Sequence, residues 1–165
     1  MDLKRRLRLL QDPSLRVALA VVLLYVVFSL VALSLHGFDP LWFAWLGERY
    51  ADLDPAGRRG YDGQFVYYIA ALGSAAVPHL DAPAYRLQRI LLPVLVRGIS
   101  GLTALPIAWA IPLVNLVAIV VTTYLLARWL AAWDITPWYA CTYALYVGVL
   151  MAYSRNLTEP LAFCF

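Results

Sequence analysis

Three long apolar runs stand out along this chain, separated by stretches that carry charge. Ser14–His36 has Arg16 as its only charged residue, residues 103–127 carry no charge, and Ile135–Ser154 is equally uncharged. A helix needs about 20 apolar residues to cross the roughly 30 Å hydrocarbon core of a bilayer. The pattern therefore predicts three membrane-spanning helices, at about residues 14–36, 103–127 and 135–154.

The first apolar run follows a short basic segment, so a cleaved signal peptide is an alternative to a membrane anchor. The apolar core of a signal peptide spans about 7–15 residues, and the 23 residues of Ser14–His36 exceed that length. We therefore favour an uncleaved anchor. Arg16 lies near enough to the end of the run for its charged group to reach the membrane surface.

Prolines shape the other two runs. The second contains Pro106, Pro112 and Asn115, and membrane helices tolerate proline where neighbouring groups satisfy the freed carbonyls. A kinked span is therefore expected. Pro137 suits the first turn of the third helix, and Arg128–Asp134 predicts a tight turn between the second and third spans.

Residues 37–102 break the apolar pattern with twelve charged side chains and are too polar to lie wholly in lipid. Asp52–Gly60 has the composition of a loop, and residues 63–72 and 85–100 are expected to form short amphipathic helices at the membrane interface. The predicted fold is an all-α, polytopic integral membrane domain over residues 1–165. A further helix is expected to start at about residue 159, where a new apolar stretch begins and suggests a longer polytopic protein.

Basic residues near the first span predict the orientation of the chain. Lys4, Arg5, Arg6, Arg8 and Arg16 lie at or before its start, which favours a cytoplasmic N-terminus in a bacterial inner membrane. The 37–102 segment is then extracytoplasmic. Its arginines oppose this orientation, because basic residues near membrane spans favour the cytoplasmic side. Long loops, however, cross the membrane largely regardless of charge.

Composition supports a membrane protein and argues against several other classes. The chain is 63% hydrophobic and 14% charged with a mean hydropathy of +0.72, whereas soluble domains average about 45–50% apolar and 25% charged residues. The net charge of +3 is small and no basic run carries interleaved aromatics, so nucleic-acid binding is unsupported. Cys141, Cys164, His36 and His79 are isolated and read as structural. No metal-ligand cluster is present, and a divalent metal requirement stays open.

The first candidate for chemistry is Asp62, within the string GYDGQFVYYIA. It lies between two glycines at the start of a short aromatic helix. A carboxylate where a polar loop meets the membrane surface can act as a general base on a substrate hydroxyl. The alternative is that Asp62 caps the helix by accepting backbone N–H bonds.

Arginines supply the second candidate. On a single helix, Arg86, Arg89 and Arg97 would fall close to one face, with Pro93 interrupting the stripe. Such a helix could lie in the interface with its guanidinium groups toward phosphates, either of a substrate or of ordinary lipid headgroups.

The string RNLTEP supplies the third candidate, because the predicted topology returns it to the outer side. Glu159 would be a second carboxylate for the same site and Arg155 a further phosphate partner. The alternative for Glu159 is a favourable charge at a helix N-terminus.

Together, the strings GYDGQFVYYIA, DAPAYRLQRILLPVL and RNLTEPLA resemble a family of bacterial polytopic membrane proteins implicated in cell-surface glycopolymer formation and related to GT-C-type glycosyltransferases. The resemblance covers Phe38 to about Ala162 and rests on the combination of strings, since the TEP string alone is weak. GT-C enzymes typically use a polyprenyl-phosphate-linked sugar and carry an acidic residue in the first outer loop, the position of Asp62. They have many more spans than this chain.

The resemblance implies a reaction and a set of substrate ligands. Asp62 would take the proton from an acceptor hydroxyl of a glycan or lipid as it attacks the anomeric carbon, while the lipid phosphate leaves and the anomeric centre inverts. Arg86, Arg89 or Arg155 would stabilise the leaving phosphate. The matching strings add Tyr61, in place of a Trp found in related mannosyltransferases. The same strings make Gln64 and Gln88 candidate substrate ligands.

Two other classes compete with an enzyme. A non-catalytic transporter, flippase or assembly subunit for surface glycopolymers would bind lipid-linked sugars through the same arginines and need no base at Asp62. Thr103–Leu126, with its two prolines, could then be a moving broken helix. A purely structural membrane subunit would leave the charged outer segment without a purpose.

Overall fold

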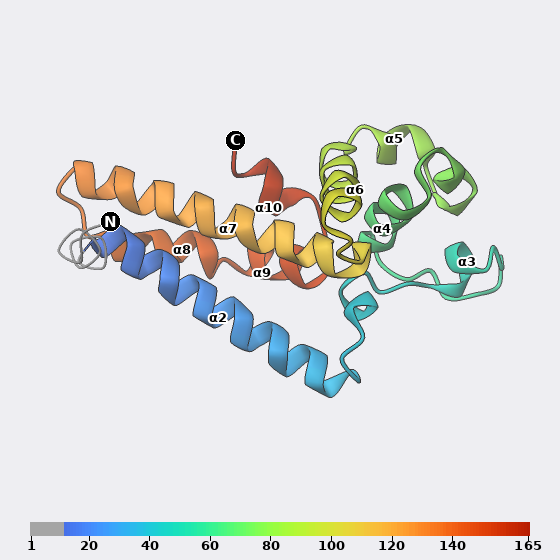
Figure 1. Cartoon of the computed structure of the whole chain (residues 1–165), viewed down its shortest axis with the longest axis horizontal. Coiled ribbons are helices and arrows are strands. Elements are labelled where there is room, and N and C mark those ends of the chain that lie inside the picture. The colour runs from blue at the N-terminus through green and yellow to red at the C-terminus, as the bar shows by residue number, and fades with distance from the viewer. Residues whose placement is uncertain (1–11) are drawn as a thin grey trace.

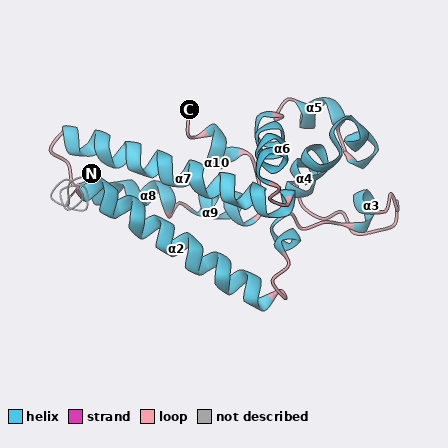
Figure 2. Cartoon of the chain, viewed as in Figure 1, coloured by secondary structure: helices cyan, strands magenta, loops and turns pink. Residues whose placement is uncertain are grey.

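The computed structural model describes residues 12–165, which are mainly helical and contain no strand (Figure 2). Two long helices, α2 (Pro13–Leu35) and α7 (Ile107–Ala132), pack against each other near the start of α2 and diverge toward its end (Figure 1). The short helices of the middle of the chain gather beyond the end at which α7 begins, at the right of the view (Figure 1). These two helices are the ones, among the described residues, that are long and apolar enough to cross a membrane.

Helix α2 confirms the predicted helix at 14–36 to within a residue at each end. Asp12 caps it by accepting a hydrogen bond from the backbone N–H of Ser14 at 2.9 Å, and Pro13 occupies the first turn. Its apolar side chains point in all directions, and many of them are exposed. These exposed residues are Leu19, Leu23, Leu24, Val26, Val27, Leu30, Val31 and Leu35.

Helix α7 is shifted along the chain relative to the predicted span at 103–127. The preceding helix ends at Thr103, Ala104 adopts a left-handed backbone with φ of 59°, and Pro106 stands just before the new helix. At its other end the helix continues past Arg128, whose guanidinium contacts the hydroxyl of Tyr124 at 3.2 Å. The turn predicted at Arg128–Asp134 is therefore shorter and begins later, after Ala132.

The third predicted span, 135–154, is wrong as a continuous helix. The structure divides it into η3 (Pro137–Ala140), α8 (Cys141–Ala144) and α9 (Val147–Ser154), with extended backbone at Tyr146. The carbonyl oxygen of Ala144, which a continuous helix would pair four residues ahead, accepts a 2.7 Å hydrogen bond from the hydroxyl of Tyr25 on α2. The hydrogen bond between α2 and α8 therefore takes the place of a backbone hydrogen bond within a single helix.

The middle segment contains η1 (Pro40–Phe43), α3 (Glu48–Ala51), α4 (Gly63–Leu72), η2 (Gly73–His79), α5 (Pro83–Leu87) and α6 (Leu91–Thr103). The predicted helix at 63–72 is confirmed as α4, and residues 52–60 form a loop as expected.

The predicted helix at 85–100 is wrong, because α5 and α6 are separate. A proline ring inside a helix clashes with the carbonyl four residues before it, which for Pro93 belongs to Arg89. The chain therefore starts a new helix at Leu91, and Pro93 lies in its first turn, where the missing N–H has no partner to lose. Arg86, Arg89 and Arg97 do not form one stripe, and Arg97 reaches the carbonyl of Ala70 at 3.5 Å instead.

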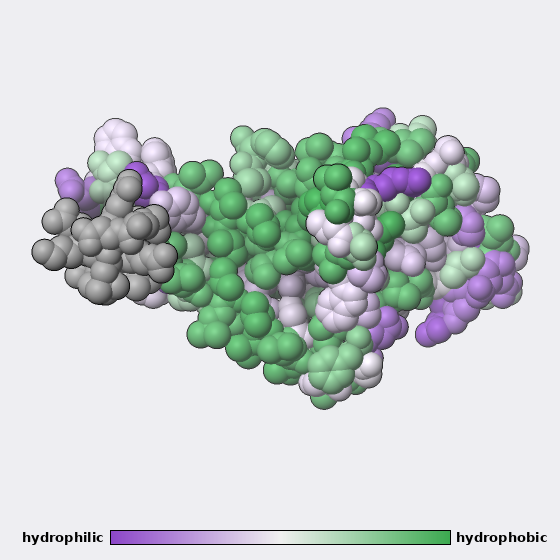
Figure 3. Space-filling view, viewed as in Figure 1, coloured by the Kyte–Doolittle hydropathy of each residue, from purple (hydrophilic) through white to green (hydrophobic). Residues whose placement is uncertain are grey.

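Apolar and polar surfaces lie at different places along the molecule. Figure 3 shows hydrophobic residues over much of α2 and α7, with hydrophilic residues gathered around the end that holds α3. The last helix, α10 (Glu159–Ala162), starts at the predicted residue and packs against α7 and α9. Lys4, Arg5, Arg6 and Arg8, on which the predicted orientation depends, lie outside the described residues.

Candidate functional site

Four charged side chains from separate segments converge beside α4. Asp62 precedes α4, Arg86 lies on α5, Arg89 lies in the turn after α5, and Glu159 begins α10. Asp62 pairs with Arg86 at 2.9 Å and Glu159 pairs with Arg89 at 3.1 Å. We call the pocket that these four residues line the Asp62 pocket.

Arg86 is the most constrained of the four. It donates through Nη1 and Nη2 to both oxygens of Asp62, at 2.9 and 3.0 Å, and through Nε and Nη2 to Asp81 at 2.8 Å. Its guanidinium also lies 4.2 Å from the ring centre of Phe65. Hydrogen bonding to Asp81 and then to Asp62 raises the pKa of Arg86, and the same bonds lower the pKa of the Asp81 carboxyl.

Asp62 stands at the capping position of α4 without acting as a cap. Its backbone is already helical and its side chain makes no capping hydrogen bond, because both oxygens face Arg86. The capping interpretation is therefore wrong. Arg86 occupies both oxygens of Asp62, so Asp62 can meet a substrate hydroxyl only when another anion draws Arg86 away.

Glu159 leaves one oxygen without a partner. Oε1 accepts from Arg89, while Oε2 is buried and makes no hydrogen bond. A buried carboxylate oxygen without a donor is costly, so it favours a ligand hydroxyl. The pocket measures about 30 Å³, room for a water molecule or two. A sugar ring enters only if the ion pairs of Arg86 and Arg89 open.

The predicted site residues divide into those that meet in this pocket and those that do not. Arg155 lies in a different pocket, with its guanidinium carbon 4.1 Å from the ring centre of Trp45. Tyr61 stacks on the same Trp45 ring at 6.4 Å, lines neither of these two pockets, and lines a third one together with Asp62 and Gln64.

Neither glutamine of the predicted ligand set lines the Asp62 pocket or the pocket of Arg155. Gln64 is buried: its Oε1 accepts from Gly47 N at 3.1 Å and its Nε2 donates to Arg59 O at 2.6 Å. It holds the preceding loop on α4 and offers almost no surface to a substrate. Gln88 is exposed and lines none of the pockets described here.

No family model, curated protein or solved structure matches this chain. Its chemistry must be inferred from its own residues.

Sequence reasoning missed three side chains that the structure places at these sites. Asp81 is the second partner of Arg86, and its spacing of five residues from that arginine was an available signal. Trp42 and Trp45, three residues apart just after the first long helix, line the pocket of Arg155. Among the described residues, no group of three or more His, Cys, Asp or Glu side chains is placed to hold a metal ion.

Proposed function

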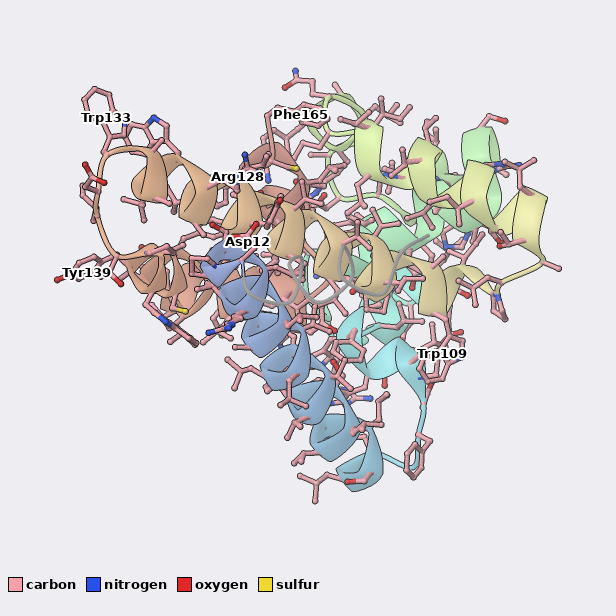
Figure 4. The ribbon with its side chains drawn as sticks, turned by 60° about the vertical axis from the view of Figure 1, so that its left-hand side comes forward. Asp12, Trp109, Arg128, Trp133, Tyr139 and Phe165 are labelled. Atoms are coloured by element: carbon pink, nitrogen blue, oxygen red, sulfur yellow. The ribbon has the colours of Figure 1, made fainter. Side chains whose placement is uncertain are left out.

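We propose that the chain is a multi-pass protein of a bacterial cell membrane, with α2 and α7 crossing the bilayer. The exposed apolar side chains of α2 support this, because a surface in water rarely carries so many apolar side chains along the uncovered side of one helix. Aromatic residues favour membrane interfaces, and Trp109 lies near one end of α7 with Trp133 and Tyr139 at the other (Figure 4). The broken segment 137–154 would return the chain to the side of Asp62.

Within that arrangement we propose transfer of a sugar from a polyprenyl-phosphate donor to a hydroxyl of a cell-surface glycan or lipid. The observation that carries the proposal is the convergence of Asp62, Arg86, Arg89 and Glu159, from three distant parts of the chain, in one pocket beyond the long helices. The pocket pairs acid–base groups with phosphate-binding groups, which is what such a transfer needs. The resemblance of the same strings to GT-C-type enzymes supports the choice of donor.

The ion pair of Asp62 with Arg86 suggests how the reaction begins. The donor phosphate competes with Asp62 for the guanidinium fork, and the freed carboxylate accepts the proton of the acceptor hydroxyl. The acceptor oxygen then forms a bond to the anomeric carbon as the bond from that carbon to the phosphate oxygen breaks. The electron pair leaves with the phosphate, whose charge Arg86 and Arg89 stabilise, and the anomeric centre inverts.

The test compares Asp62→Asn with the wild type in vesicles supplied with candidate polyprenyl-phosphate sugars. Loss of a well-placed base lowers the rate by about 10²–10⁴-fold, so transfer should fall by that factor while membrane insertion is unchanged. Asp54→Asn is the matched control, since Asp54 is an exposed loop carboxylate whose side chain accepts from the backbone N–H of Ala56, away from the Asp62 pocket. Wild-type transfer by Asp62→Asn would reject the proposal, and undiminished movement of lipid-linked sugar by both variants would favour the transporter class.

A further inference from the structure

The second pocket, which we call the Arg155 pocket, is much larger than the Asp62 pocket and shares no lining residue with it. Its volume is about 540 Å³, within the range of about 300–1,000 Å³ typical of sites for small molecules. The loop after α2, the η1 helix and the turn after α9 build it. Its walls are His36, Asp39, Leu41, Trp42, Trp45, Leu46 and Arg155.

Arg155 brings a positive charge that no carboxylate among the described residues neutralises. Its guanidinium lies over the rings of Trp45 at 4.1 Å and Trp42 at 5.1 Å, and its Nη1 is buried without a hydrogen-bond partner. Burial lowers its pKa, yet an arginine stays protonated. Arg86 and Arg89, by contrast, are both ion-paired. A partly desolvated, unpaired guanidinium favours an anionic ligand.

Two hydrogen-bond acceptors face the same pocket. Oδ1 of Asp39 accepts from the backbone N–H of Leu41 at 2.9 Å, which leaves Oδ2 for a ligand. Nδ1 of His36 lies 2.7 Å from the carbonyl oxygen of Ala32; because a carbonyl only accepts, Nδ1 carries a proton, and in that imidazole tautomer Nε2 is an acceptor. The pocket therefore suits a ligand that brings hydroxyl donors as well as an anion.

Trp45 supplies a flat apolar surface. It is about half exposed, at 49%, although Arg155 covers one part of it and Tyr61 stacks on its ring at 6.4 Å. The ring of Trp42 is more occupied, since the His36 ring lies 4.7 Å from it and Arg155 lies at 5.1 Å. The C–H face of a pyranose ring packs on an indole, while ring hydroxyls donate to carboxylates and imidazoles. A bare phosphate of a lipid headgroup would use Arg155 and leave Asp39 opposed by a like charge.

We propose that the Arg155 pocket binds a sugar ring that carries an anionic group, with the ring on Trp45, its hydroxyls on Asp39 and His36, and the anion on Arg155. A sugar phosphate and a hexuronate share this chemistry. This inference goes beyond transfer by Asp62, because the pocket binds such a ligand whether or not a sugar is transferred.

The experiment measures binding to the full chain in nanodiscs of zwitterionic lipid by isothermal titration. The probes are glucose 1-phosphate, glucuronate, neutral glucose and inorganic phosphate, followed by glucose 1-phosphate in nanodiscs that contain phosphatidylglycerol. We expect both anionic sugars to bind at least tenfold more tightly than glucose or inorganic phosphate. The tighter of the two identifies the anion as a phosphate ester or a carboxylate.

Variants separate the parts of the site. Arg155→Gln should weaken binding of the anionic sugars by about 10–100-fold, the effect of losing a hydrogen bond to a charged group, and leave glucose unchanged. Trp45→Ala should weaken all the sugars. Arg128→Gln and Trp133→Ala are matched controls, because these residues lie at the opposite end of α7 (Figure 4). Asp62→Asn should bind as the wild type does, so a failure of catalysis and a failure of this site are distinguishable.

Three results would overturn the assignment. If Arg155→Gln binds the anionic sugars as tightly as the wild type, Arg155 does not contact the anionic group. Inorganic phosphate that binds as tightly as glucose 1-phosphate would make this an anion site without a sugar contact. Loss of glucose 1-phosphate binding in phosphatidylglycerol would show that Arg155 belongs to lipid headgroups.

Discussion

Replacing Gly63 with alanine tests whether the site depends on how closely α4 approaches the turn after α9. A Cβ at this position would lie 1.9 Å from the carbonyl oxygen of Arg155 and 2.9 Å from its carbonyl carbon. Both are backbone atoms, so no side chain can rotate away. The Cβ and the oxygen must separate from 1.9 Å to at least 3.0 Å, and either α4 or the turn has to move.

The size of the effect follows from that displacement. Overpacking a tight contact typically costs about 1–3 kcal/mol, and here the rigid backbone places the expected cost toward the upper end. A chain of this length loses about 2–4 °C of melting temperature for each kcal/mol. Because Asp62 is the neighbour of Gly63, a shift of about 1 Å should also lower transfer by about 10²-fold.

Thermal unfolding in detergent and transfer in vesicles measure the two effects. Gly98→Ala is the matched control: it lies in α6, a Cβ there meets nothing within 4 Å, and alanine should stabilise the helix by up to about 1 kcal/mol. If Gly63→Ala unfolds at the wild-type temperature and transfers sugar at the wild-type rate, the close approach has no role and the reasoning is refuted.

Three further outcomes follow from single contacts. Arg86→Lys keeps the charge but loses the planar guanidinium that holds Asp62 and Asp81 together, so transfer should fall about 10–100-fold. Equal transfer rates for this variant and the wild type would show that the guanidinium geometry has no role. Since Arg86 lowers the pKa of Asp81, the stability from this pair is present above the unfolded pKa of about 3.9 and is lost as pH falls further. Hydrogen-exchange protection factors in α5, which correct for the intrinsic effect of pH on exchange, should therefore fall below about pH 4, and protection that stays constant to pH 2 would contradict this. Tyr25→Phe removes the hydroxyl that bonds to Ala144 O and should cost about 0.5–1.5 kcal/mol, seen as a lower melting temperature than that of Tyr139→Phe, an exposed tyrosine.

The sequence was informative where a local rule decides the structure. Uniform apolar character gave α2, and the Asp62-Gly63 pair before an aromatic run gave α4 with the bounds observed. It failed where partners distant in the chain decide. Nothing near Leu145 signals a break, since the bond that replaces the helical one comes from Tyr25.

The candidate site shows the same division. Asp62, Arg86, Arg89 and Glu159 could be chosen as residue types suited to phosphate and acid–base chemistry, and the structure brings them together in one pocket. Their pairing was not predictable, because it depends on the fold that brings α10 next to the turn after α5. Arg155 looked like a fifth member of the same site, and only its packing on Trp45 places it in another pocket.

One short turn joins the two pockets. Arg155 and Glu159 are four residues apart on it, its Arg155 carbonyl packs on Gly63, and its Leu157 carbonyl accepts a 3.0 Å hydrogen bond from Asn115 of α7. A ligand that displaces this turn from either side therefore alters the other pocket as well. Such coupling is reciprocal, so the factor by which one ligand changes the affinity for the second equals the factor in the opposite direction. Because Asn115 bonds to this turn, we expect a change in the tilt of α7 to reach both pockets together.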